Sequence, residues 1–390
     1  DGVMAKLGEV CTIVSGSTPK TSVTSYWDGN IKWITPAELN EDTFYIMDSV
    51  RHITEEGKEK TGLSYLPTGT VILSSRAPIG KTAIAGCEMC CNQGFKNLIC
   101  SDAIYNEYLY FFLKSKTDYL NSLGRGATFK EISKSIVESI EIPLPEVNQQ
   151  KEIAEKFKKL EQLISLRKQQ LAKLDELVKA RFVEMFGDPA DNVNNLPASP
   201  MTAICQIIDG DRGKNYPKQE EFSDSGFCLF LNAKNVTAQG FSFENCTYIT
   251  EEKDALLRNG KLCRGDVVLT TRGTIGNLAF YDTSVPYENI RINSGMVILR
   301  MNKQVVSEIF FIEQFKMQLD SIKSRIASGS AQPQLPISTM NKIEMILPPI
   351  ELQNQFAAFV ERVSQQKQTV QQSLEKLELM KKALMQEYFG

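Results

Sequence analysis

The stretch that decides the fold occurs twice. It is first written Val71-Ile72-Leu73-Ser74-Ser75-Arg76-Ala77-Pro78-Ile79-Gly80. It returns 196 residues later, from position 71 to position 267, as Val267-Val268-Leu269-Thr270-Thr271-Arg272-Gly273-Thr274-Ile275-Gly276. In both places an apolar, β-branched run leads into hydroxyl side chains, an arginine and a turn that ends in glycine. A repeat of this kind indicates two copies of one structural unit.

Other matches keep the same order along the chain. Ile53-Thr54-Glu55-Glu56 returns as Ile249-Thr250-Glu251-Glu252, again 196 residues later. The offset grows to 201 for Asn92-Gln93-Gly94-Phe95 and Asn293-Ser294-Gly295-Met296, and to 203 for Met185-Phe186-Gly187 and Tyr388-Phe389-Gly390. Small insertions explain the drift, so we infer one unit duplicated in tandem.

Each copy predicts a compact mixed domain followed by a long helix. Short β-like runs, such as Thr70–Ser74 and Asp266–Thr271, come first and are broken by turn residues. A proline-rich segment then ends the strand pattern, and a charged, glutamine-rich helix follows it. The fold class is therefore α+β, with two tandem mixed α/β domains and two long helices. The predicted boundaries are 1–145 and 191–349 for the domains, and 146–190 and 350–390 for the helices.

The apolar residues of the two helices follow steps of three and four, as in a coiled coil. They are Ile153, Phe157, Leu160, Ile164, Leu171, Leu174, Val178 and Met185, and Phe356, Val360, Val363, Val370, Leu374, Leu377, Leu384 and Tyr388. Polar interruptions fall at different heights in the two stripes, since Arg167 corresponds to Val370 and Ile164 to Lys367. We expect an antiparallel pair with pseudo-two-fold symmetry, in which about 54 Å of helix from Lys151 to Phe186 sets a spacing. The alternative is two amphipathic helices, each lying on its own domain.

Composition favours an ordinary globular protein in a reducing compartment. No apolar run approaches the length of about 18 residues that spans a bilayer, and the first residues lack a signal-peptide pattern. Nine cysteines in mainly apolar surroundings suit free thiols rather than disulfides. We therefore expect a cytoplasmic protein. The net charge of −3 requires any DNA-binding surface to be local.

In this order, several motifs give the chain a strong resemblance to the specificity subunits of Type I restriction-modification systems. They are Lys6-Leu7-Gly8-Glu9-Val10, Ser15-Gly16-Ser17-Thr18-Pro19, Tyr26-Trp27, Trp33-Ile34-Thr35-Pro36, Ser75-Arg76-Ala77-Pro78-Ile79-Gly80, Gly126-Ala127-Thr128-Phe129-Lys130, and Ile142-Pro143-Leu144-Pro145 with Gln149-Gln150. The resemblance covers essentially the whole chain. It implies two target-recognition domains, each reading half of a split double-stranded DNA site. It also implies two methyltransferase subunits as partners, restriction and translocase subunits in the full complex, and no catalysis by this chain.

The second copy departs from these motifs. Gly213-Lys214-Asn215-Tyr216-Pro217-Lys218 lies near the place of Thr18-Pro19-Lys20, and Phe227-Cys228-Leu229-Phe230 replaces Ile31-Lys32-Trp33-Ile34. Such divergence suits two domains that read different sequences.

The candidate DNA contacts are basic and polar residues in turns and loops. Arg76 and Arg272 could grip phosphate or pair with guanine, or could instead form internal salt bridges. The polar-loop candidates, for which solvated loop charge is the alternative, are Thr18, Lys20, Lys214, Tyr216 and Lys218. Two small-residue loops, otherwise ordinary interdomain loops, contribute Arg125, Thr128, Lys130, Ser330, Gln332 and Gln334. Lys81 and Arg291 complete the predicted set.

An enzyme has little support in the sequence. The single histidine, His52, removes most general-base schemes, and no nucleotide-binding or amino-methylation motif occurs. Glu56-Gly57-Lys58 resembles part of a nuclease motif, but the second copy has Glu252-Lys253-Asp254. We expect no cofactor and no metal. A coiled-coil assembly scaffold without DNA binding, or a nuclease, is the alternative.

Overall fold

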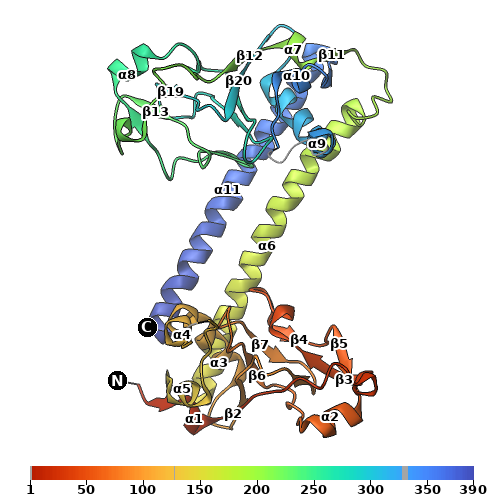
Figure 1. Ribbon diagram of the computed structural model, residues 1–390, viewed down its shortest axis with the longest axis vertical. Helices are drawn as coiled ribbons and strands as arrows, with labels where there is room; N and C mark the ends of the chain where they lie inside the picture. The colour runs from red at the N-terminus through yellow and green to blue at the C-terminus, as the bar shows by residue number, and fades with distance from the viewer. Residues whose placement is uncertain (1, 127, 327–332) are drawn as a thin grey trace. The chain divides into compact units, whose positions relative to one another are not determined.

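The computed structural model describes residues 2–126, 128–326 and 333–390. It divides into two compact units: unit 1 comprises Asp1–Lys168 and Gln371–Gly390, and unit 2 comprises Gln169–Val370. Each unit contains one mixed domain together with parts of the two long helices, α6 (Val147–Phe186) and α11 (Ile350–Phe389) (Figure 1). The predicted fold class, two tandem mixed domains with two long helices, is confirmed.

The domain of unit 1 is built around a five-stranded sheet of order β2-β9-β6-β7-β4. A three-stranded sheet, β5-β3-β8, and the pair β1-β10 complete it. The strands are β1 (Met4–Lys6), β2 (Cys11–Val14), β3 (Trp27–Ile34), β4 (Tyr45–Ile46), β5 (Arg51–Ile53), β6 (Val71–Leu73), β7 (Thr82–Ala85), β8 (Cys90–Cys91), β9 (Asn97–Cys100) and β10 (Glu141–Pro143). The α-helices are α1 (Leu7–Val10), α2 (Glu55–Thr61), α3 (Asn106–Ser115), α4 (Thr117–Leu123) and α5 (Lys134–Ser139).

The domain of unit 2 repeats this plan around a four-stranded sheet of order β12-β20-β17-β18. A three-stranded sheet, β16-β13-β19, and the pairs β11-β21 and β14-β15 complete it. The strands are β11 (Ala198–Pro200), β12 (Cys205–Asp209), β13 (Cys228–Phe230), β14 (Val236–Thr237), β15 (Gly240–Phe241), β16 (Tyr248–Ile249), β17 (Val267–Thr270), β18 (Leu278–Phe280), β19 (Ile290–Arg291), β20 (Met296–Met301) and β21 (Glu344–Ile346). The α-helices are α7 (Met201–Ile204), α8 (Glu251–Leu256), α9 (Glu308–Ile326) and α10 (Ile337–Met340).

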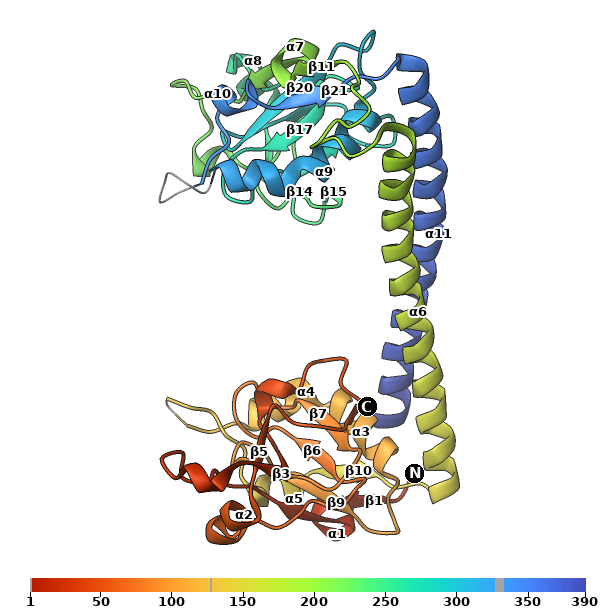
Figure 2. The same ribbon diagram turned by 90° about the vertical axis from the view of Figure 1, so that its right-hand side faces the viewer.

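The repeated apolar run forms the central strand of each sheet, and both of its faces are buried. In β6, Val71 and Leu73 pack in the cluster that contains α3, while Ile72 packs in a separate cluster on the other side. In β17, Val267 and Leu269 likewise pack in the cluster that contains α9, and Val268 does not. Successive strand residues point to opposite faces, so a continuous apolar run fits a strand covered on both sides. Figure 2 shows α9 lying along one face of its sheet.

Two repeated motifs have simple local causes. Thr54 and Thr250 are the N-caps of α2 and α8, where each hydroxyl accepts from the backbone N–H three residues on, at 3.1 Å. The turns after β6 and β17 end in Gly80 and Gly276, with φ of 98° and 91°. L side chains rarely adopt this conformation, which explains why glycine occurs in both copies.

The long helices pack on one another within each unit, as the complementary stripes predicted. In unit 1 the rings of Phe157 and Phe389 stack with their centroids 5.7 Å apart. In unit 2 the rings of Phe182 and Phe356 meet edge to face at 5.4 Å. The first stripe differs from the prediction near its end, where Phe182 and Phe186 are fully buried and Met185 is only half-buried. The two phenylalanine rings pack in the core of the domain, so the buried face of the helix at this end includes them and leaves Met185 only partly covered.

A buried glutamine joins the start of each long helix to its domain. The amide of Gln150 donates to the carbonyls of Ala103 and Pro145, and its oxygen accepts from the N–H of Tyr105. Gln353 repeats this pattern with the carbonyls of Val305 and Pro348 and the N–H of Ser307. Neither side chain is exposed. The two glutamines are 203 residues apart, which is the offset found at the helix ends. Both copies therefore use the same hydrogen-bonded connection between helix and domain.

Within the described ranges, no helix has the length and apolarity needed to cross a membrane. All nine cysteines lie in these ranges, and they are free thiols.

Candidate nucleic-acid interface

The arginine turn of unit 1 lies where three loops meet. The N–H of Ser75 donates to the carbonyl of Gly94 at 2.9 Å, and the N–H of Ile132 donates to the carbonyl of Ser75 at 3.0 Å. Arg76 comes three residues after the end of β6 and faces Glu131 across an isolated β-bridge. Its side chain is 46% exposed, and its Nε lies 3.4 Å from Glu131 Oε1.

The same carboxylate oxygen of Glu131 also meets Lys96 Nζ at 3.3 Å. One acidic group thus holds two cations, with a formal charge of +1 for the three residues together. The predicted alternative, a salt bridge at Arg76, is present, but nearly half of the guanidinium side chain still reaches solvent. An exposed pair of this kind is weak, so Arg76 remains able to meet an anion.

The arginine turn of unit 2 repeats this backbone arrangement. The N–H of Thr271 donates to the carbonyl of Gly295, and the N–H of Leu335 donates to the carbonyl of Thr271, both at 2.9 Å. Arg272 is exposed and faces Gln334 across an isolated bridge. Gln334 occupies the position of Glu131, so an amide replaces the carboxylate. Among the residues that the structure describes, Arg272 has no acidic partner within salt-bridge distance.

The glycine whose carbonyl anchors each arginine turn is itself held by an asparagine. Asn92 Oδ1 accepts from the N–H of Gly94 at 2.9 Å, and Asn293 Oδ1 accepts from the N–H of Gly295 at 2.8 Å. Asparagine side chains favour such local turns. The repeated Asn-x-Gly motif therefore positions the arginine turn.

The structure brings other predicted residues of unit 1 to the same place. Thr18 donates to Gln93 Oε1 at 2.6 Å, which places it beside Gly94, and Lys20 is exposed on the same loop. Lys81 is half-buried: its N–H donates to Ser74 Oγ, and its Nζ donates to the carbonyl of Pro36 at 3.2 Å.

The remaining predicted residues of unit 1 lie on the loop that ends at Glu131. Arg125 and Glu131 exchange two backbone hydrogen bonds of 3.0 Å, which close the loop. Arg125, Thr128 and Lys130 are all exposed. They therefore lie on the loop beside Arg76, and their side chains face solvent.

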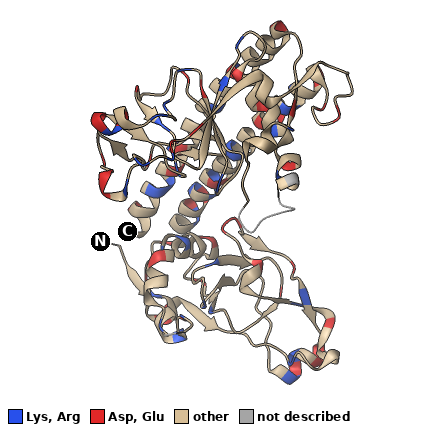
Figure 3. Ribbon diagram, turned by 45° about the horizontal axis from the view of Figure 1, so that its top comes forward, with Lys and Arg blue, Asp and Glu red and all other residues tan. Residues whose placement is uncertain are grey.

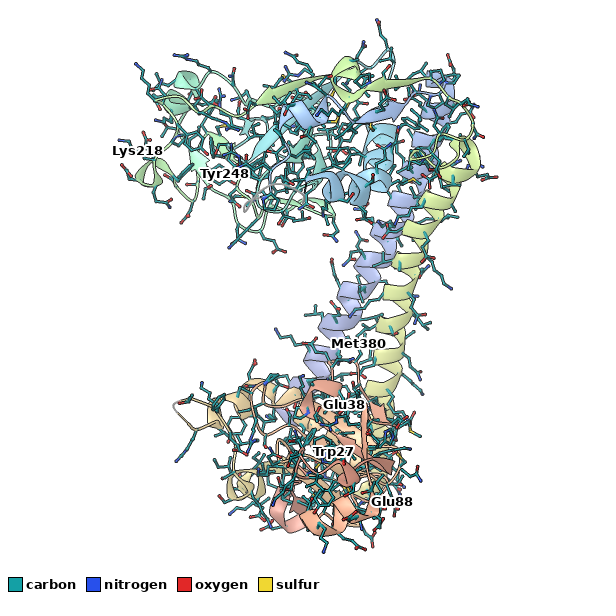
Figure 4. The ribbon with its side chains drawn as sticks, turned by 45° about the vertical axis from the view of Figure 1, so that its right-hand side comes forward. Trp27, Glu38, Glu88, Lys218, Tyr248 and Met380 are labelled. Atoms are coloured by element: carbon teal, nitrogen blue, oxygen red, sulfur yellow. The ribbon has the colours of Figure 1, made fainter. Side chains whose placement is uncertain are left out.

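In unit 2, the polar loop approaches the arginine turn through a tyrosine. The hydroxyl of Tyr216 accepts from the N–H of Ser294 at 3.3 Å, one residue before Gly295. Lys214 and Lys218 are exposed on either side of Tyr216. Figure 4 shows Lys218 at the edge of its domain. This loop corresponds in place to the one that carries Thr18 in unit 1.

Arg291 does not belong to this surface, although the sequence suggested it. It is 5% exposed, and its guanidinium donates to the Asp254 carboxylate and to the carbonyls of Asn259 and Leu257. Burial would raise the pKa of Asp254, but hydrogen bonds and charge from Lys261 and Arg291 outweigh it and hold that pKa below its ordinary value. The guanidinium is used inside the domain, so we leave Arg291 out of the interface. Ser330 and Gln332 lie outside the described residues.

Sequence reasoning missed two basic residues. Lys96 directly precedes β9, at the end of the mostly polar stretch Asn92-Gln93-Gly94-Phe95, and reaches Glu131 only through the fold. Arg212 is exposed, and its Nη2 donates to Asp209 Oδ1 at 3.1 Å and to the carbonyl of Ser294 at 3.3 Å. Its place in the divergent loop, just before Lys214, was the available signal.

Acidic and basic residues are mixed over the chain. Figure 3 shows acidic and basic positions interspersed on the domains and along the long helices. In the described part of the chain, no group of three or more histidine, cysteine, aspartate or glutamate side chains could hold a metal ion.

Two mixed domains of the same plan, each with an exposed arginine after its central strand, make this chain a tandem-repeat protein of two similar domains. The family model for the Type I restriction modification DNA specificity domain matches residues 1–176 and 201–379. The chain therefore belongs to this family.

Named relatives agree with this assignment. The specificity subunit of the Type I restriction enzyme MjaIX from Methanocaldococcus jannaschii is 29% identical over 394 residues, which cover 93% of this chain and 86% of that protein. The specificity subunit of EcoR124I/EcoR124II from Escherichia coli is 26% identical over 164 residues, 40% of each chain. The crystal structure of a Type I S subunit from M. genitalium has the same fold, with a TM-score of 0.59 and 17% identity over 100% of this chain and 96% of that one.

Proposed function

We propose that this chain is the DNA specificity subunit of a Type I restriction-modification enzyme and that each unit reads one half of a bipartite DNA site. The observation that carries the proposal is the repeated arginine turn: Arg76 and Arg272 stand on the same backbone frame, surrounded by loops of different sequence. Two domains with the same backbone arrangement around the arginine and with different surrounding loops suit two DNA-binding domains that recognise different sequences. Arginine suits this task because its planar fork can grip phosphate or pair with guanine.

The proposal assigns the residues of the interface by unit. Unit 1 contributes Thr18, Lys20, Arg76, Lys81, Arg125, Thr128 and Lys130. Unit 2 contributes Lys214, Tyr216, Lys218, Arg272 and Gln334, to which we add Arg212. Exposed lysines and arginines would position the backbone of the duplex, and Gln334 suits an adenine edge.

The long helices have two proposed roles. Each contains 40 residues, which corresponds to about 60 Å of helix at 1.5 Å per residue. We propose that they set the unread gap between the half-sites, and that they dock two methyltransferase subunits, joined in the full complex by restriction and translocase subunits. The chain would act in the cytoplasm and supply no catalytic group of its own.

Single-molecule methylation sequencing tests the proposal. The full chain is expressed with the methyltransferase of its own system in a host that lacks other methylation. We expect one modified motif made of two short defined sequences separated by a fixed run of unspecified bases. A continuous motif, or no motif that depends on this chain, would refute the proposal.

A further inference from the structure

The loop from Arg125 to Glu131 presents an aromatic ring to solvent. Phe129 is 81% exposed, more than any other aromatic side chain in the described part of the chain. Single exposed apolar side chains are common on protein surfaces, so the groups around Phe129 decide whether it marks a contact.

The base of this loop is fixed. Besides the two backbone hydrogen bonds between Arg125 and Glu131, the Glu131 carboxylate meets both Arg76 and Lys96. The tip is shaped by Gly126, whose φ is 130°. A Cβ at this glycine would lie 2.1 Å from the carbonyl oxygen of Phe129, so no other residue allows the chain to turn this way. The frame thus holds Phe129 outward on a supported loop.

The charges around the ring indicate the chemistry of its partner. Arg125 and Lys130 flank Phe129, and both are exposed. Arg76, partly exposed, lies at the base of the same loop. An apolar ring between cations complements a surface that offers apolar stacked faces between anionic groups, and the base steps and phosphates of a DNA duplex have that pattern.

We propose that Phe129 enters the half-site read by unit 1 as a wedge that partly unstacks one base step, while Arg125 and Lys130 contact the neighbouring phosphates. This inference rests on the proposed function. It applies to one half-site, because the matching loop of the second copy, Ser328-Gly329-Ser330-Ala331-Gln332-Pro333-Gln334, contains no aromatic residue in its sequence. Side chains that kink DNA in this way read the deformability of a step, so Phe129 would add specificity at a position without base hydrogen bonds.

The test uses the full chain with its methyltransferase and duplexes that carry the motif found by methylation sequencing. 2-Aminopurine replaces one base at a time across both half-sites, and its fluorescence rises where a base unstacks. We expect a rise at each base that the methyltransferase flips out for methylation, and one further rise at a step in the half-site of unit 1. Phe129→Ala should abolish this further rise, leave the rises at the flipped bases unchanged, and weaken binding about ten-fold, since base–aromatic stacking is worth that order of affinity. Phe129→Trp should keep the further rise.

Val50→Ala is the matched control, because Val50 is an apolar side chain of the same unit and is 83% exposed. It should change neither readout, and circular dichroism should show that all variants fold. A further rise that persists in Phe129→Ala, or no rise beyond those at the flipped bases in the wild type, would overturn the inference. Loss of methyltransferase binding with unchanged DNA binding would also overturn it and make Phe129 a protein contact. The wild-type titration on the same duplexes tests the proposed function separately, and failure there would overturn both.

Discussion

The arginine turns of the two units share their backbone and differ in the charge opposite the arginine. Arg76 faces Glu131, which also holds Lys96, whereas Arg272 faces Gln334. The hydrogen bonds that fix both turns are made by main-chain groups, so they tolerate a change of side chain at the bridging position. The same backbone arrangement can therefore hold an arginine in place while the residue opposite it, which sets the local charge, differs between the units.

The largest expected effect is confined to unit 2. Arg291→Met should lower the free energy of unfolding of unit 2 by about 3 kcal/mol, because it leaves the buried Asp254 without its guanidinium partner. The pKa of Asp254 is below its ordinary value of 3.8 in the folded protein, so its contribution is present above that pH and is lost as the pH falls through the lowered value. Urea titrations at pH 7 and near pH 3 should show a loss in the variant that is smaller at the lower pH. An equal loss at both would contradict this account.

The buried glutamines should show what the two units share. Gln150→Ala and Gln353→Ala should each lower the free energy of unfolding by about 2 kcal/mol, since each leaves three backbone groups without a partner. The exposed neighbours Gln149 and Asn354 supply matched alanine controls, which should change stability little. Markedly unequal losses at Gln150 and Gln353 would break the idea of a common frame.

Removal of each arginine should sharpen the difference between the turns. Arg272→Ala should weaken DNA binding about ten-fold, and Arg76→Ala less, because Arg76 shares its charge with Glu131. Neither variant should unfold, since both side chains are exposed. Fluorescence anisotropy at matched salt measures the affinity. Unchanged affinity in both variants would assign the arginines to structure.

Exchange of the residues opposite the two arginines, Glu131 and Gln334, should give the smallest change in DNA affinity and the most specific one. Glu131→Gln should strengthen DNA binding a few-fold, because it releases Arg76 and Lys96 from a carboxylate, and Gln334→Glu should weaken it by a similar factor. Both effects should shrink as salt rises. Shifts in the same direction for the two variants would contradict the assigned roles.

The repeated domain plan could be predicted from the sequence more fully than the contacts within the interface. A duplicated strand, its arginine turn and the helix stripes are local patterns, and local patterns are visible as repeats. The pairing of Lys96 with Glu131, and the choice of a carboxylate or an amide opposite each arginine, depend on loops brought together only by folding.

Arg291 was predicted to contact DNA because its side chain is basic, but the structure buries it. Its basic side chain suggested DNA, yet it lies between Ile290 and Ile292, both buried, in a stretch that reads as an interior strand. That apolar context was the signal for a buried ion pair. The paired glutamines could also have been found, because Gln150 and Gln353 differ by the same 203 residues as the helix ends.

The central claim is that one repeated frame carries two independent readers. Exchange of residues 191–349 for the corresponding segment of a relative with a different target tests it most directly, with methylation sequencing as the readout. The account predicts that one half of the modified motif changes and that the other half and the spacing stay the same. A change in both halves would contradict it.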